Sequence, residues 1–497
     1  MKPTLQITYA AQLANQETLM EKTKHPRSRN LAVRLRLVTI ATLCVVGAIK
    51  DVSATTYGVK LISAKGGGSL MNDAGDIVGV IQTPGRCFPY PSCWVNNTVV
   101  VWPAGQQRAI PLPAPEGQPF IAVSGLNAAG WLAGTVSSGL VDFAPQPVAW
   151  EPSESGYTLH AIGLLPGNTI ARVAGIDDLN RVVGYSTDST IAPLNAAPFV
   201  WDPVGGLRNL TASGFPNEIP LALSPHGAVA LLKGWYRLDE PGVVTPNAPP
   251  PAGFTPEASA KINDAGDQAR FLITTGSQNI AYFYRHVSAS GEWQQLSALG
   301  SGRLSRYGIG SINDASDITG TIASSGVIAA GPEGLSTSLA AQLSPAYGGM
   351  PITSAKSLNK KGHILASAEL GGHSLRLVRL FPIKPCTASC LRVANLQLVA
   401  KRVTECRASN QVSVTLTVTD EAGKRQPGVQ LRGRFLDGYW LDKRVSGATD
   451  TRGVVRFTHT GRACVGAITF FVDQASAKGR VFDRSQGILV KSIIPAS

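Results

Sequence analysis

Residues 71–79 read Met71-Asn72-Asp73-Ala74-Gly75-Asp76-Ile77-Val78-Gly79. The same phrase recurs about every 48 residues: an apolar residue, Asn, two free positions, Gly, one free position, and then apolar and small residues. The seven copies begin at Met71, Leu126, Ile176, Leu223, Ile262, Ile312 and Leu358. Self-similarity at this period is typical of repeat proteins, in which no unit buries its apolar face alone. We therefore predict an array of similar units.

Each copy has the chemistry of a tight turn between two strands. Asn can bond its own backbone, and Gly adopts the positive φ that other residues resist. Asn fills the second position in five copies and Gly the fifth in five. Asp177 and Ser224 keep an oxygen acceptor at the second position, and Asn180 tolerates the left-handed conformation at the fifth. The predicted turn residues are Asn72, Gly75, Asn127, Gly130, Asp177, Asn180, Asn263, Gly266, Asn313, Asn359 and Gly362.

An apolar and aromatic strand is predicted downstream of most copies. Examples are residues 99–102, 147–150, 198–201 and 281–284, and a third short run often follows, as at 207–210 and 293–296. Three or four short strands in 40 to 50 residues fit one blade of a β-propeller better than a solenoid coil. We predict an all-β chain in which residues 55–385 form a seven-bladed β-propeller.

The phrases Ile262-Asn263-Asp264-Ala265-Gly266-Asp267 and Ile312-Asn313-Asp314-Ala315 resemble the repeat of the bacterial extracellular HAF-repeat family. The resemblance covers roughly residues 57–385. It rests on the number of copies, because the motif is short and the fourth copy departs from it. The resemblance implies export and β structure, but no particular chemistry.

The repeat motif ends and the sequence pattern changes beyond about residue 386. Residues 411–418 alternate between apolar and polar, as in a strand with one face in a core. Further strands are predicted at 429–435 and 467–472, with the segment 449–457 between them, so residues 386–497 are predicted to form a β-sandwich. The Thr449-Asp450-x-x-Gly453 phrase resembles bacterial immunoglobulin-like modules, which implies a spacer or adhesion unit.

The first 54 residues are predicted to be a signal peptide with an extended basic region. Four arginines precede an apolar run from Leu37 to Ile49, and Val52-Ser53-Ala54 offers a cleavage site. The run is shorter than the ~20 residues of a spanning helix. Two alternatives are a start of synthesis at Met20 and an uncleaved anchor. The mature chain is predicted to be secreted, extracellular or periplasmic, with no membrane span.

Six cysteines remain after this segment, and an even number fits disulfides in an oxidising compartment. The candidates are Cys87, Cys93, Cys386, Cys390, Cys406 and Cys464. Cys87 and Cys93 are close enough to join one loop, and three pairings are open for the other four. Among these we favour Cys386 or Cys390 with Cys406.

Charge is distributed unevenly along the chain, whose formal net charge is +13. Residues 386–497 hold seventeen Lys or Arg against eight acidic residues, and the repeat region is close to neutral. A basic sandwich could meet an anionic surface by long-range attraction, although a solvated basic face explains the same charge. A cell-surface glycan, a wall polymer or a protein is a possible partner. Nucleic acid is not expected, since no motif supports it.

No catalytic, cofactor-binding or metal-ligating residue is nominated. Calcium is the one ion considered, because three repeat turns carry several oxygen ligands, but the alternating ligands and final Glu of an EF-hand are absent. The predicted function is a noncatalytic binding or surface-interaction role. The alternatives are an exported glycosidase or lyase, whose paired carboxylates would come from different blades, and a structural spacer.

Overall fold

The computed structural model describes residues 55–493, except 64–65, 84–95, 107, 140–143, 189–195, 276–280, 299–307, 333, 371–374, 402–409, 438–441 and 462–466. The predicted signal peptide, residues 1–54, lies outside this part. The described residues form strands and three short 3₁₀ helices, η1 (Thr211–Ser213), η3 (Ala340–Gln342) and η4 (Pro345–Tyr347). The prediction of an all-β chain is confirmed.

The described repeat region consists of seven four-stranded antiparallel sheets, numbered here in chain order. Sheets 1 and 2 hold β2 (Gly66–Met71), β3 (Ile77–Thr83), β4 (Asn96–Trp102), β5 (Ile110–Pro111), and β6 (Phe120–Leu126), β7 (Leu132–Ser137), β8 (Gln146–Ser153), β9 (Gly156–Ala161). Sheets 3 and 4 hold β10 (Ile170–Ile176), β11 (Val182–Thr187), β12 (Ala197–Asp202), β13 (Gly206–Asn209), and β14 (Ala222–Leu223), β15 (Ala228–Ala230), β16 (Gly234–Arg237), β17 (Val244–Pro246). Sheets 5 and 6 hold β18 (Phe254–Ile262), β19 (Gln268–Thr274), β20 (Ala281–Val287), β21 (Glu292–Ala298), and β22 (Gly308–Ile312), β23 (Ile318–Ile322), β24 (Ser325–Ala329), β25 (Ser336–Ser338). Sheet 7 holds β26 (Ile352–Leu358), β27 (Ile364–Glu369), β28 (Leu375–Pro382) and β1 (Tyr57–Ser63).

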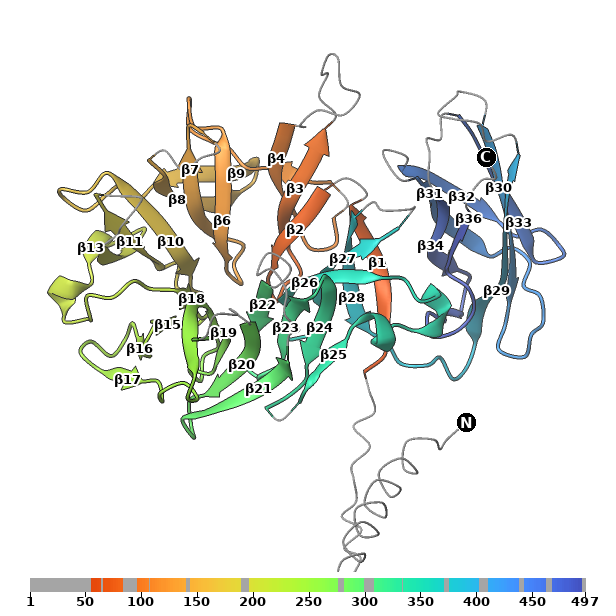
Figure 1. Ribbon diagram of the computed structural model, residues 1–497. Helices are drawn as coiled ribbons and strands as arrows, with labels where there is room; N and C mark the ends of the chain where they lie inside the picture. Colours follow the sequence, from red (N-terminus) through yellow and green to blue (C-terminus); the bar gives the residue numbers. More distant parts are fainter. Residues whose placement is uncertain are drawn as a thin grey trace, which may run out of the picture. The chain divides into compact units, whose positions relative to one another are not determined.

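The motif lies between the first and second strands of every one of these sheets. Each first strand contacts the first strand of the next sheet, and β26 of sheet 7 also contacts β2 of sheet 1. The sheets follow one another in sequence order, from orange through green in Figure 1. This succession of small sheets is propeller-like.

Apolar side chains are buried between consecutive sheets rather than within one. Trp150 of sheet 2 packs in one cluster with Val78 and Val101 of sheet 1, and the other neighbouring sheets share clusters in the same way. Leu365 and Leu377 of sheet 7 pack with residues of sheet 1. Because such burial is the main favourable term in folding, each sheet depends on its neighbours for stability.

Strand β1 is an exception to sequence order, because it completes the last sheet. It pairs antiparallel with β28, from Tyr57 opposite Pro382 to Ser63 opposite Leu377. Tyr57, Val59 and Leu61 are at most 3% exposed. The two ends of the repeat region are therefore hydrogen-bonded to each other.

The C-terminal region contains two further four-stranded sheets. Their strands are β33 (Val454–Gly461), β30 (Asn410–Thr419), β29 (Cys390–Lys401), β35 (Val481–Phe482), and β32 (Asp442–Ala448), β31 (Gln430–Leu436), β34 (Ile468–Ser476), β36 (Val490–Ile493). All pairings are antiparallel except that of β29 with β35. The alternating residues Val412, Val414, Leu416 and Val418 are fully buried.

Residues 54–497 form one compact unit. The last strand of sheet 7 ends at Pro382 and β29 begins at Cys390, close to the predicted boundary after residue 385. One hydrophobic cluster nevertheless contains Leu380 of sheet 7 and Phe471 of β34. The repeat region and the C-terminal sheets therefore share part of their core.

Candidate functional site

The seven repeat turns, defined as the second to sixth residues of each motif copy, share one hydrogen-bond pattern. The second residue's N–H donates to the sixth residue's carbonyl, and the fifth residue's N–H donates to the second residue's carbonyl. The second side chain accepts from the sixth N–H, as Asn127 does from Trp131 at 2.9 Å, and the other six copies repeat this bond. The fifth residue has a positive φ in every copy, including Asn180 and Ser316. All eleven predicted turn residues occupy these positions.

The side-chain amide nitrogen of the Asn at the second turn position has a second role, which the turn chemistry did not predict. In four copies it donates to the carbonyl oxygen of the second residue in the next repeat turn. These bonds run from Asn72 to Asn127 at 2.9 Å, Asn127 to Asp177 at 2.9 Å, Asn263 to Asn313 at 3.1 Å, and Asn359 to Asn72 at 3.2 Å. Asn suits both roles because its side chain carries an acceptor and a donor. The bond from Asn359 joins the seventh repeat to the first.

Two of these amides also reach the non-Gly residues that have positive φ. Asn127 Nδ2 donates to Asn180 Oδ1 at 2.7 Å, and Asn263 Nδ2 lies 3.4 Å from Ser316 Oγ. A left-handed conformation is costly for a residue with a Cβ. At these two positions a hydrogen bond between repeats helps to offset that cost.

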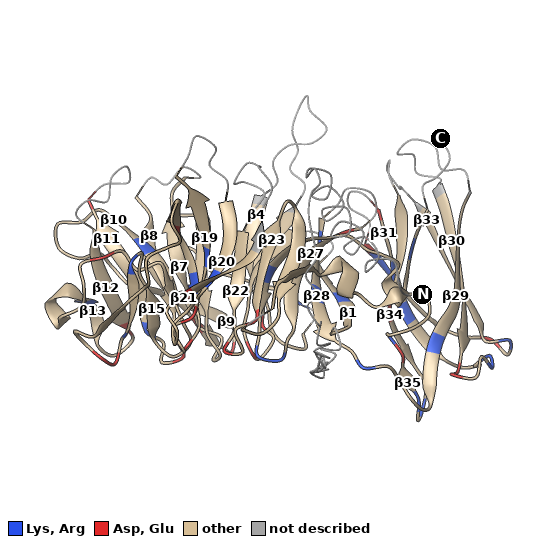
Figure 2. Cartoon of the chain, turned by 60° about the horizontal axis from the view of Figure 1, so that its bottom comes forward, with Lys and Arg blue, Asp and Glu red and all other residues tan. Residues whose placement is uncertain are grey.

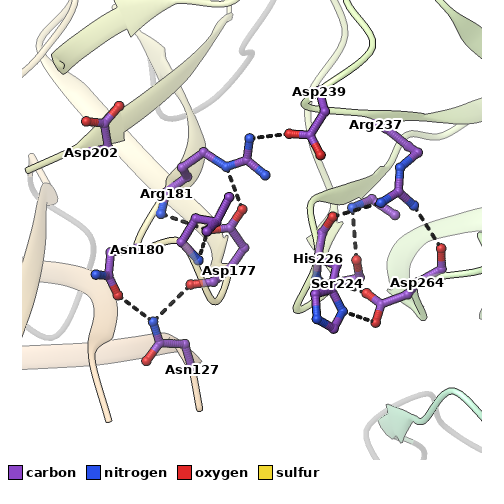
Figure 3. A network of polar contacts seen from close by, with 12 residues as sticks. Asn127, Asp177, Asn180, Arg181, Asp202, Ser224, His226, Arg237, Asp239 and Asp264 are labelled. Atoms are coloured by element: carbon purple, nitrogen blue, oxygen red, sulfur yellow. Dashed lines mark hydrogen bonds and ion pairs between the residues drawn. The ribbon is translucent and has the colours of Figure 1, made fainter. Parts of the chain in front are cut away.

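Asp177 replaces Asn in the third repeat and is fully buried. Figure 3 shows it beside Arg181. Its carboxylate accepts from the backbone N–H of Arg181 at 2.8 Å and from Arg181 Nε at 2.7 Å. Arg181 also pairs with Asp239 of sheet 4. Burial raises the pKa of Asp177 above its ordinary value, although the bonds from Arg181 oppose this rise. Repeats 3 and 4 are therefore linked by the ion pairs of Arg181 with Asp177 and Asp239, rather than by a side-chain amide.

His226 and Asp264 link repeats 4 and 5 (Figure 3). The His226 backbone N–H donates to Asp264 Oδ1 at 2.9 Å, and the two side chains form an ion pair. The hydrogen bond to Asp264 raises the pKa of His226 above its ordinary value. Burial acts to raise the pKa of Asp264, but hydrogen bonds from His226 and Ser224 outweigh it and lower the pKa.

Most acidic positions of the repeat region lie at the lower strand ends in Figure 2.

A cavity of about 170 Å³, here called the axial cavity, is lined by residues from all seven repeats. Its charged lining residues are Asp73, Asp178 and Lys261. Asp73 accepts the backbone N–H of Lys360 at 2.8 Å, and Asp178 accepts that of Ala128 at 2.9 Å. The side chain of Lys261 forms no hydrogen bond or ion pair with another described residue. Burial lowers the pKa of Lys261 below its ordinary value.

Lys261 is charged and long, unlike the residues that immediately precede the motif in the other six repeats. These residues are Leu70, Gly125, Gly175, Ala222, Ser311 and Ser357. Space is limited here because the position faces the next repeat: a Cβ on Gly125 would lie 2.7 Å from the Ile176 nitrogen. An alignment of the seven copies could have identified the Lys, but reasoning from the motif alone missed it.

A second cavity, of about 450 Å³, shares Lys261 with the axial cavity. It borders an irregular part of β18, where the register shifts between Pro256 and Ala260. Glu257, Ala258 and Ser259 lie opposite the single residue Phe271, so β18 carries two extra residues here. All three of these β18 residues line this cavity. Bulges of this kind redirect side chains and often lie beside functional sites. Lys261 therefore lines both cavities, where its amine can meet an anionic or carbonyl-bearing group.

The turn carboxylates considered for calcium are used within their own sheets. Asp76, Asp267 and Asp317 each accept a backbone N–H from the turn after the third strand, donated by Ala104, Ser288 and Gly331 respectively. Among the described residues, no three His, Cys, Asp or Glu side chains are grouped to hold a metal ion.

The cysteine prediction needs a correction. The structure joins Cys386 to Cys390 in a disulfide, so the favoured pairing of either residue with Cys406 is wrong. Only three residues separate these two cysteines, so the disulfide closes a short local loop. Cys87, Cys93, Cys406 and Cys464 lie outside the described residues.

No helix in the described part of the chain has the length and apolar character needed to cross a membrane. No family model matches the chain, and no curated protein matches it. A mutant of puromycin hydrolase complexed with PGG is similar at 14% identity and a TM-score of 0.38, over 72% of this chain and 60% of that chain. AofleA from Arthrobotrys oligospora is similar at 10% identity and a TM-score of 0.26, over 83% of this chain and 94% of that chain. Such low TM-scores assign no function to this chain.

Proposed function

We propose that this protein is an exported, noncatalytic binding protein that holds an acidic saccharide in the axial cavity, in contact with Lys261. The single observation that carries this proposal is the unpaired Lys261 amine, at a position where the other six repeats have small or apolar residues. A partly buried ammonium without a partner costs stability. Such a cost is understandable where a ligand supplies the missing anionic partner.

The proposed scaffold is a closed seven-bladed β-propeller of the HAF-repeat type followed by an immunoglobulin-like β-sandwich. Two features support closure: the contact between β26 and β2, and the hydrogen bond from Asn359 to Asn72. In such a ring the ligand meets strands near the axis. Export is supported by the Cys386–Cys390 disulfide, because disulfides persist mainly in oxidising compartments.

The dimensions of the two cavities fit a saccharide. The axial cavity, about 170 Å³, has roughly the volume of five or six water molecules at their share of the liquid. The neighbouring cavity, about 450 Å³, lies in the usual range of ligand pockets. Aspartates 73 and 178 are occupied by backbone amides, which leaves Lys261 to recognise an anionic ligand.

The test is Lys261→Met, examined with the full chain from Ala54 onward on an array of neutral and uronic-acid-containing oligosaccharides. Wild type is expected to retain acidic members, and the variant to bind them at least about tenfold more weakly, since one charge-assisted hydrogen bond contributes about 1.5–3 kcal/mol. The urea midpoint of the variant should be unchanged or higher, because Met removes an unpaired ammonium and keeps the apolar stem.

Three outcomes would overturn the proposal: no retention of any saccharide, equal retention by Lys261→Met, or cleavage of a bound saccharide. Lys424→Met is the matched control, because Lys424 is exposed on a C-terminal turn. The control variant should bind like wild type.

A further inference from the structure

A separate small cavity, here called the cationic pocket, lies where the first and last repeats meet the C-terminal sheet of β31 and β32. Its volume is about 60 Å³. Four basic side chains from four strands line it: Lys60 of β1, Arg379 of β28, Arg434 of β31 and Arg444 of β32. Figure 2 shows basic positions on the neighbouring strands β1 and β28.

Arg434 is fixed in place and only 7% exposed. Its Nε and Nη2 donate to the two carboxylate oxygens of Asp473 at 2.9 and 2.8 Å. Its remaining nitrogen, Nη1, is buried without a hydrogen bond to any described residue and lies 3.7 Å from Asp442 Oδ2. This Nη1 is one strong donor without a hydrogen bond, and Oδ1 of the neighbouring Asp442 is likewise buried without one.

The Arg379 side chain lies close to the first repeat turn. A Cβ placed on Gly75 would lie 3.4 Å from Arg379 Nη1, and Arg379 Nε is buried without a hydrogen bond to any described residue. Burial lowers the pKa of Arg379. Burial, followed by the charges of Arg379 and Arg484, lowers the pKa of Lys60. These side chains repel one another at close range.

Positive charge exceeds negative charge around the pocket. Two carboxylates, Asp442 and Asp473, contact Arg434, whereas four basic side chains line the cavity. Lys60 and Arg379 form no ion pair with a described carboxylate, and their two charges are matched better by a phosphate group of −1.5 to −2 at neutral pH than by a single carboxylate. Guanidinium groups bind phosphate through paired N–H donors.

The small volume further restricts the ligand. About 60 Å³ is twice the share of one water molecule in the liquid. A single phosphate group fits this volume, but a sugar ring does not. Anything attached to that group must lie outside the pocket.

We propose that the cationic pocket binds a doubly charged phosphate group, either inorganic or carried by a larger extracellular molecule. The bound group would satisfy donors from sheet 7 and from β31 together. It would thereby tie the closure of the repeat region to the C-terminal sheets. This site is separate from the axial cavity and does not depend on the role of Lys261.

The test measures thermal unfolding of the full chain from Ala54 onward, with inorganic phosphate, sulfate, acetate or chloride at matched ionic strength. Phosphate and sulfate are expected to raise Tm by about 2–4 °C in a saturable manner, because a ligand that binds the folded state stabilises it. Acetate should behave like chloride. Glycerol 3-phosphate separates the two sources: an equal rise indicates an esterified group, and no rise indicates free phosphate.

Two variants locate the effect. Arg379→Met and Lys60→Met should each keep or raise the Tm in chloride, since each removes a repelling cation, and should reduce the phosphate-induced shift at least fivefold. Arg456→Met, at an exposed position of β33, and Lys261→Met should retain the wild-type shift. No phosphate-specific shift in wild type, an equal shift with acetate, or a full shift in both pocket variants would overturn the proposal.

Discussion

Replacing Arg181 by Met is expected to lower the free energy of unfolding by about 3–5 kcal/mol, because it leaves the buried Asp177 carboxylate without its counterion. Asp177 has no exposed side-chain surface, and Arg181 is its one charged partner among the described contacts. Urea unfolding followed by tryptophan fluorescence measures the loss. The raised pKa of Asp177 means that its charge costs stability as pH rises above about 3.8. The deficit of the variant should therefore be smaller at pH 4.5 than at pH 7.

A second substitution is expected to rescue this variant. Asp177→Asn combined with Arg181→Met removes the buried charge and restores the residue type found in five other repeats. Its stability should return to within about 1 kcal/mol of wild type, and the part of the pH dependence contributed by Asp177 should disappear. As a control, Arg208→Met breaks the more exposed pair with Asp202 and should cost less than about 1 kcal/mol. A double variant as unstable as Arg181→Met would refute this account of the third repeat.

A chain that begins at Gly66 and lacks β1 is expected not to unfold as a single cooperative unit. Three nearly fully buried side chains, Tyr57, Val59 and Leu61, are lost. At about 1.5–3 kcal/mol each, their burial is comparable with the whole stability of a typical protein. The urea transition should become broad and shift to low concentration.

The matched chain begins at Ala54, so it keeps every described strand and should unfold cooperatively. A synthetic peptide of residues 55–63, added to the shorter chain, should restore part of the transition, because an added strand can pair with an exposed sheet edge. Identical urea transitions for the two chains would show that β1 does not complete sheet 7.

The repeat fold was predictable because its period, turn residues and aromatic strands are local signals. Trp102, Trp150 and Trp201 lie in the predicted strands and are buried between sheets. The place of β1 was not predictable in this way. Its partner β28 lies more than 300 residues away, and nothing in residues 57–63 distinguishes the last sheet from the first.

The candidate sites were much less predictable than the fold. The motif identified Asn72 and its equivalents as turn formers, but the bonds from four of these amides to the next repeat depend on the spacing of neighbouring sheets. Lys261 carried a sequence signal only by comparison with the other six copies. The cationic pocket carried none, since Lys60, Arg379 and Arg434 are brought together by three distant segments.

The proposal that the repeats close into a ring is tested most directly by zero-length carbodiimide cross-linking of the intact protein, followed by mass spectrometry. Lys360 Nζ lies 3.7 Å from Asp73 of the first repeat and 3.3 Å from Asp314 of the sixth. A closed ring predicts amide-linked peptides joining Lys360 to both aspartates, and Lys360→Arg should abolish both links. A link to Asp314 without any link to Asp73, which is 287 residues away in sequence, would indicate an open array and contradict the account.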